Sequence, residues 1–178
     1  MLIKVNKLSK NFQSYFLPIC LILILSFSRL IPHPSNFTPI LAVGVFSGFY
    51  FRNFLLGVVI VIFSMFLGDL YLGFHGMMFF TYISLAIAVA LGFLIKHLKF
   101  TEILFSGLAS SACFFLVTNF GAWLVLDMYE KNLAGLLQSY VFAVPFFHNT
   151  LISTLLYLIL LKLLFDFVIR KKIIKTFA

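Results

Sequence analysis

Charged residues are scarce in this chain, and acidic residues are the scarcest. Only 10% of the 178 residues are charged, Asp and Glu together number 5, and 63% of the residues are hydrophobic. A soluble domain of this length has no core large enough to bury so much apolar surface. The composition excludes an ordinary water-soluble protein and predicts an integral membrane protein whose solvent is the lipid bilayer.

Cysteine is also rare, and the histidines form no recognisable ligand pattern. Cys20 and Cys113 both lie within apolar runs, where we expect buried small side chains rather than a disulfide or a metal pair. His33, His75 and His148 lie near expected helix ends, but their spacing matches no known metal motif. We therefore predict no metal site and no cofactor.

The common catalytic motifs of membrane enzymes and ATPases are missing. The chain has no phosphate-binding Gly-x-x-x-x-Gly-Lys motif, so we expect no ATP hydrolysis by the chain itself. It has no Gly-x-Ser-Gly nucleophile, and its two glutamates, Glu102 and Glu130, are far apart in the sequence. We predict that the protein is not an enzyme.

Six apolar runs are long enough, or nearly long enough, to span a bilayer. Because backbone groups in lipid must bond within their own segment, each run should form a helix. The second run is short, and a run of that length is also compatible with a re-entrant loop. The runs are 14–31, 38–51, 54–73, 77–95, 103–126 and 147–169.

The basic residues decide how these runs cross the membrane. The net charge is +8, but the basic residues lie at helix ends rather than along a stripe, so we expect no nucleic-acid partner. Six crossings with both termini in the cytoplasm leave only Arg29 and Lys131 outside. The cytoplasmic side then holds Lys4, Lys7, Lys10, Arg52, Lys96, Lys99, Arg170, Lys171, Lys172 and Lys175.

This distribution follows the positive-inside rule, whereas a non-crossing second run would move the C-terminal lysines outside. We therefore predict an all-α, multi-pass protein of the cell inner membrane, with residues 1–178 forming one six-helix transmembrane domain. Cleavage of the first run as a signal peptide, after the small residues Ser26 and Ser28, remains an alternative.

Between the fifth and sixth runs the pattern changes. In residues 127–144, Leu133, Leu137 and Tyr140 fall at helical spacing opposite Gln138 and other polar residues. This pattern predicts an amphipathic helix lying in the membrane interface, which Pro145 should end.

The predicted outer side collects chemically varied polar residues. The loop 33–39, with the sequence HPSNFTP, supplies His33, Asn36 and Thr38, and we expect it to form one wall of a polar site. Arg29 and Asp69 lie close to the same side, where they should either pair as a structural tie or contact a ligand.

Two further groups on this side are candidates for the same site. Asn119 and Trp123 are four residues apart and share a helix face, which suits an aromatic ligand or, alternatively, a membrane-interface tryptophan beside a helix-packing amide. His148, Asn149 and Thr150 should lie at the start of the sixth span, where they either cap the helix or meet an anionic ligand.

Two other spacings predict contacts away from this side. Gly44 and Gly48 form a small-residue face for close helix packing, within the bundle or with another subunit. Lys162 and Asp166 are four apart and should form an ion pair.

Four stretches together resemble a known family. They are RLIPHPSNFTPILAVGVFSGFYF, SMFLGDLYLGFH, TNFGAWL and YEKNLAGLLQSYVFAVPFFHNT. They are similar to a family of short bacterial membrane proteins classed with transport proteins, and that family is similar in turn to the S components of energy-coupling-factor transporters. The resemblance covers roughly residues 25–155.

The resemblance implies a six-helix subunit that captures a small vitamin-like nutrient from outside. Its partners would be a transmembrane coupling subunit and cytoplasmic ATPases, although the first run lacks the alanine pattern with which many S components meet the coupling subunit. The alternative is a structural or accessory subunit of a larger membrane complex, with no ligand of its own. Carried over by position, the substrate-binding residues would be His33, Asn36, Thr38, Asn119, Trp123, His148 and Asn149, to which the residue chemistry adds Arg29 and Asp69.

Overall fold

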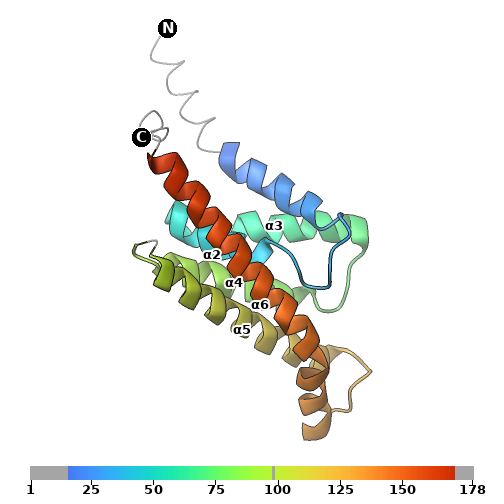
Figure 1. Cartoon of the computed structure of the whole chain (residues 1–178). Coiled ribbons are helices and arrows are strands. Elements are labelled where there is room, and N and C mark those ends of the chain that lie inside the picture. Colours follow the sequence, from blue (N-terminus) through green and yellow to red (C-terminus); the bar gives the residue numbers. More distant parts are fainter. Residues whose placement is uncertain (1–15, 98, 171–178) are drawn as a thin grey trace.

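The described part of the chain consists of helices joined by short connections (Figure 1). The computed structural model describes residues 16–97 and 99–170, and every regular element in these ranges is a helix. An all-helical fold with helices in the six apolar runs is therefore confirmed. The helices are Phe16–Ser28, α2 (Ile40–Phe51), α3 (Phe54–Leu72), α4 (Met78–Leu94), α5 (Phe100–Val125) and α6 (Leu133–Arg170).

Successive helices run in opposite directions. Gly44 lies beside Ala88, and Gly48 lies beside Gly92, so α2 and α4 are parallel. Gly121 of α5 packs on Phe80 of α4, which makes these two helices antiparallel. The connections after Ser28, α3 and α5 therefore gather at one end of the bundle, and those after α2 and α4 gather at the other.

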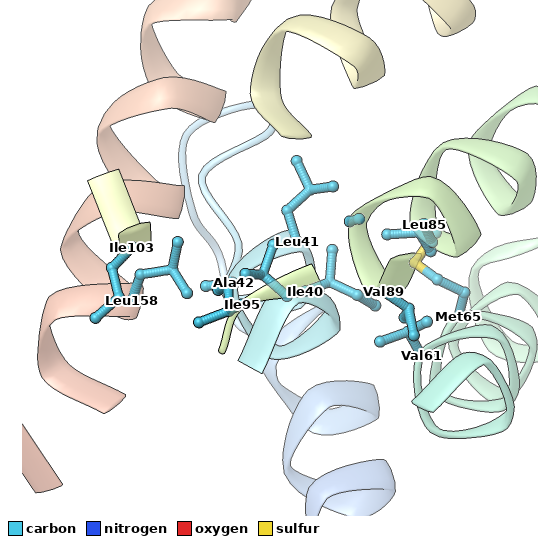
Figure 2. Close-up of a cluster of buried hydrophobic side chains, with 12 residues drawn as sticks. Ile40, Leu41, Ala42, Val61, Met65, Leu85, Val89, Ile95, Ile103 and Leu158 are labelled. Carbon is cyan, nitrogen blue, oxygen red and sulfur yellow. The ribbon is translucent and has the colours of Figure 1, made fainter. Parts of the chain in front are cut away.

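The short helix α2 is the centre of the bundle. It packs against α3, α4, α5 and α6, and nearly every residue from Ile40 to Gly48 is buried. Figure 2 shows Ile40 and Leu41 between Leu158 on one side and Leu85 on the other. A helix segment buried on all sides has no need of a polar face, which explains why residues 40–48 are apolar except for Ser47.

Glycines allow α2 and α4 to touch backbone to backbone. A Cβ atom added to Gly92 would lie 1.8 Å from the Val45 carbonyl oxygen, and one added to Gly48 would lie 2.1 Å from the Val89 carbonyl oxygen. Small residues at a crossing permit this approach, and close packing is a main source of helix association in lipid. Of the two alternatives for Gly44 and Gly48, the structure shows packing within the bundle.

Large apolar side chains cover the outside of the helices. Three described helices are long and apolar enough to cross a membrane by length and composition: α3, α5 and Leu133–Phe167 of α6. The helix Phe16–Ser28, α2 and α4 are apolar but shorter. Side chains such as Leu55 and Phe105, which are 71% and 73% exposed, favour lipid over water, so the protein is a membrane protein.

The prediction that Pro145 ends a separate interfacial helix is wrong. Pro145 lies inside α6, which continues from Leu133 to Arg170 and changes direction along its length (Figure 1). A proline removes one backbone donor and bends a helix, but neighbouring helices can hold both halves in place. The small residues Gly135 and Ser139 are buried, whereas Leu137 is exposed.

Because α6 begins at Leu133, His148–Thr150 cannot cap a helix start, and this alternative is also wrong. Thr150 lies in the helix interior and donates its hydroxyl to the Phe146 carbonyl at 3.1 Å. The helix start is capped instead by Asn132, whose side-chain oxygen accepts the Gly135 N–H at 2.8 Å.

The crossing of α2 and α4 gives the first prediction. Replacing Gly92 with alanine should destabilise the protein by about 1 to 3 kcal/mol, because the new methyl group meets backbone atoms that cannot rotate away. The control is Gly44→Ala, whose Cβ would lie an ordinary 3.4 Å from the Ala88 side chain. Equilibrium unfolding in mixed detergent micelles measures both variants, and equal stability of the two would contradict the backbone contact.

Candidate ligand-binding site

A buried ion pair joins three helices at the end of the bundle that carries the 29–39 connection. The Arg29 Nη1 atom lies 2.7 Å from Asp69 Oδ1, and the Asp69 side chain is only 1% exposed. Arg29 also donates to the Met65 carbonyl at 2.8 Å, and the Tyr82 hydroxyl donates to Asp69 Oδ2 at 2.7 Å. The predicted pairing of Arg29 with Asp69 is confirmed, and Tyr82 extends it to α4.

A glycine makes room for the arginine. A Cβ atom added to Gly68 would lie 2.3 Å from Arg29 Nη1, so any side chain at this position would displace the guanidinium. Gly68 immediately precedes Asp69, and both are buried in α3. The sequence Gly-Asp therefore supplies both the space and the counter-charge for Arg29.

Next to this pair lies a partly open cavity of about 250 Å³. Its walls come from the 29–39 connection, the α3–α4 connection and helices α2 to α6. His33, Asn36 and His75 are exposed, so the cavity opens at this end of the bundle. The lining residues are Arg29, His33, Asn36, Thr38, Ile40, Leu41, Met65, His75, Thr81, Leu85, Phe114 and Thr150.

The lining is divided into a polar part and an apolar part. Arg29, two imidazoles, one amide and three hydroxyls provide the polar groups, while Ile40, Leu41, Met65, Leu85 and Phe114 provide the apolar surface. Ligand sites in proteins commonly combine a mostly apolar wall with a few polar groups that orient the ligand. The volume is slightly below the range for drug-sized ligands, so the cavity suits a smaller molecule.

The loop 33–39 is fixed against α6. Its central turn is closed by a hydrogen bond from the Phe37 N–H to the Pro34 carbonyl at 2.9 Å, with Asn36 at a φ of 61°. Asparagine tolerates this left-handed conformation better than most residues. The Asn149 amide then donates to the Ser35 carbonyl at 3.0 Å, so this predicted site residue holds the wall of the cavity.

Two aromatic rings add to this attachment. The ring of Phe37 packs edge to face on Tyr157 of α6, with centroids 6.2 Å apart. One helical turn away from Tyr157, the Ser153 hydroxyl contacts the Asn36 carbonyl at 3.4 Å. The loop 33–39 is therefore held in a defined position by its contacts with α6.

Four of the predicted site residues line the cavity, and the others lie elsewhere. Arg29, His33, Asn36 and Thr38 form its polar rim, and Asp69 lies behind Arg29. Three do not reach it. Asn119 donates to the Phe115 carbonyl of its own helix at 2.8 Å, Trp123 donates to the Glu130 carbonyl at 2.9 Å, and His148 is exposed on α6.

Trp123 instead belongs to the turn between α5 and α6. Its indole N–H bonds across this turn, and Lys131 donates to the Trp123 and Leu126 carbonyls at 2.6 and 2.7 Å. A lysine at this position satisfies carbonyls that a helix end leaves unpaired. The turn is thus a structural feature separate from the cavity.

Thr150, a candidate from the sequence, lines the cavity, whereas two other polar lining residues, His75 and Thr81, were absent from the predicted site. Thr81 and Leu85 lie four residues apart on one face of α4 and both line the cavity. Because residues four apart share a helix face, this spacing could have indicated from the sequence that Thr81 faces the same side as Leu85. Within residues 16–97 and 99–170, no group of three His, Cys, Asp or Glu residues lies close enough to hold a metal ion.

Comparison with known proteins identifies a family. One family model matches residues 9–176, nearly the whole chain. The chain belongs to DUF6580, a family of unknown function. Neither the curated proteins nor the solved structures give a match to the chain. What this DUF6580 member does must therefore be argued from its own residues.

The buried pair of this DUF6580 protein gives the second prediction. Asp69→Asn should lower the free energy of unfolding by about 3 to 5 kcal/mol, because it leaves the Arg29 charge buried without its partner. The control pair, Lys162 and Asp166, is 2.8 Å apart on one helix with side chains 18% and 36% exposed. There, Asp166→Asn should cost about 0.5 kcal/mol or less.

Unfolding in mixed micelles measures both variants. A further comparison removes both charges with Arg29→Met and Asp69→Leu, which should cost less than the sum of the two single changes. Additive losses would show that the two side chains do not depend on each other.

Proposed function

We propose that this protein binds a small nutrient from the outer side of the bacterial inner membrane, as the substrate-binding subunit of a transporter. The observation that supports this most directly is the partly open cavity of about 250 Å³ at one end of the bundle. An accessory subunit without a ligand has no need of such a space, and close packing normally fills the interior of a protein.

The distribution of charge supports an outward-facing cavity. At the opposite end of the bundle, Arg52 donates to the carbonyls of Phe93 and Lys96 at 3.1 and 3.2 Å, which places Arg52 beside the basic α4–α5 connection. Helix α6 also ends at this side, at Arg170. Under the positive-inside rule this end faces the cytoplasm, and the cavity then faces outward.

The alternating helix directions support the proposal that the chain crosses the membrane six times. Three helices have sufficient length alone, and the shorter ones are apolar. We propose that Phe16–Ser28, α2 and α4 complete the crossings together with their flanking residues. Helix α2 is protected from lipid by its neighbours, so it does not itself need to match the bilayer thickness.

The likeness to S components suggests the partners. Because the chain has no nucleotide-binding motif, active uptake would require another protein, and S components work with a transmembrane coupling subunit and cytoplasmic ATPases. The vitamin-like nature of the nutrient also comes from this likeness alone. Both points rest on the sequence motifs of residues 25–155 and remain proposals.

The third prediction tests for a bound ligand. Protein purified in mild detergent should carry a small molecule that mass spectrometry of a denatured extract detects, and Thr38→Trp should abolish its retention by filling the cavity. Ser35→Trp is the matched control, because Ser35 lies on the same loop but is not among the lining residues. Equal retention by both variants, or no molecule in the unmodified protein, would favour the accessory-subunit alternative.

The fourth prediction tests the orientation. In a variant without Cys20 and Cys113, a cysteine in place of His33 should react in whole cells with a membrane-impermeant maleimide. A cysteine in place of Lys96, which is exposed at the opposite end, should react only after the cells are opened. The reverse pattern would place the cavity in the cytoplasm and contradict uptake from outside.

A further inference from the structure

The charges around the cavity discriminate between classes of ligand, and this inference rests on the proposed ligand-binding function. Arg29 is the one permanently charged residue among the lining residues, and none of them is Asp or Glu. Asp69 is 1% exposed and does not line the cavity, because it lies behind Arg29 and His75, whose Nε2 atom is 4.0 Å from Asp69 Oδ1. A cationic ligand would find no carboxylate here, whereas an anionic ligand would meet a guanidinium.

Arg29 has hydrogen-bonding capacity left for such a ligand. Its Nη1 atom serves both Asp69 and the Met65 carbonyl. Within residues 16–97 and 99–170, its Nε and Nη2 atoms form no hydrogen bond or ion pair. These atoms carry three of the five N–H donors of a guanidinium, and a carboxylate can accept two of them side by side.

Further donors surround the same region. His75 is exposed at the rim, and its imidazole can present an N–H group. His33 is also exposed there, but it donates its Nδ1–H to the Ile31 carbonyl, so the Nε2 atom of the neutral ring is an acceptor. Thr38 and Asn36 add a hydroxyl and an amide from the loop wall. Thr81 and Thr150 already donate their hydroxyls to helix carbonyls, at 3.1 Å in each case, so toward a ligand they act as acceptors.

The charge balance limits how much negative charge the ligand carries. Asp69 already compensates Arg29 at 2.7 Å, so the cavity does not hold a strong excess of positive charge. A phosphate monoester or a dicarboxylate would bring two negative charges toward one neutralised guanidinium. A single carboxylate brings only one negative charge, and its two oxygens match the planar fork of N–H donors in arginine.

The apolar part of the cavity lining indicates what the uncharged part of the ligand is. Ile40, Leu41, Leu85 and Phe114 provide apolar surface in the same cavity, which has a volume of about 250 Å³. We propose that the ligand is a small organic monocarboxylate. Its carboxylate accepts N–H donors from Arg29, and its compact apolar body lies against Leu85 and Phe114.

The test, which is the fifth prediction, uses two series of probes that differ only in the head group. The first series is phenylacetate, phenylacetamide and phenethylamine, and the second is hexanoate, hexanamide and hexylamine. Each is titrated into the purified full-length protein, freed of co-purified molecules, and binding is measured by calorimetry at pH 7. At least one carboxylate should bind at least tenfold more tightly than its amide and its amine.

A neutral version of the ion pair tests the role of Arg29. In Arg29→Gln with Asp69→Asn, two amides replace the two charges, which should preserve folding while removing the tenfold preference for the carboxylate. The matched control, Lys162→Gln with Asp166→Asn, alters the surface pair of α6 and should keep the preference. A folded Arg29/Asp69 double variant that retains the preference would overturn the assignment of Arg29.

The possible outcomes distinguish a failure of the monocarboxylate assignment from a failure of the proposed function. Tighter binding of an amide or an amine, or co-purification of a molecule without a carboxylate, would overturn the monocarboxylate assignment and leave a ligand-binding protein. If no probe binds up to millimolar concentration and no molecule co-purifies, then both the assignment and the proposed function fail.

Discussion

A single buried ion pair, Arg29 with Asp69, fixes the start of the 29–39 connection at the cavity end of the bundle. Removing Arg29 and Asp69 from water is costly, and the pair is tolerated because each charge has further partners: the Met65 carbonyl for Arg29 and the Tyr82 hydroxyl for Asp69. These contacts join the helix Phe16–Ser28 to α3 and α4. The 29–39 connection starts directly from this fixed point, so the position of the whole loop depends on it.

The cavity exists because the central helix is shorter than its neighbours. With 12 residues, α2 is about 18 Å long, whereas α5, with 26 residues, is about 39 Å long. At the level of Ile40, where α2 begins, the lining residues Met65, Phe114 and Thr150 come from α3, α5 and α6. These three helices continue beyond that level, so the centre of the bundle is left without a helix there.

The loop 33–39 occupies part of that space without filling it. Its turn, its bonds to Asn149 and Ser153, and the contact between Phe37 and Tyr157 hold it against α6. The non-helical backbone of the loop is satisfied mainly from α6, because Asn149 and Ser153 donate to the Ser35 and Asn36 carbonyls. Asn36 and Thr38 of the loop supply polar groups to the cavity.

Much of this arrangement could be predicted from the sequence, because lipid imposes simple rules. Long apolar runs must be helices, and Arg29 and Asp69, as rare charges near one end, had few possible partners other than each other. Predictions failed where a short-range rule competed with tertiary contacts. A proline commonly ends a helix in a water-soluble protein. Here both halves of α6 are packed, and the helix continues through Pro145.

Asn119 and Trp123 illustrate a second limit. Spacing correctly indicated that both lie in one helix, near the C-terminal end of α5, but it could not show how their donors are used. Each N–H group bonds to a nearby carbonyl, at Phe115 and Glu130, and neither residue lines the cavity. Thr81, in contrast, was not predicted as a site residue, because a threonine within an apolar helix usually bonds to its own backbone. Thr81 does donate to the Met77 carbonyl, but it also lines the cavity.

The most direct measurement is an experimental density map of the protein purified from its native membrane without added ligand. The account predicts density for a small molecule between Arg29 and Phe114, beneath the loop 33–39 and above Ile40. A map in which the side chains of Leu41, Leu85 and Phe114 close together and leave no space beside Arg29 would contradict it.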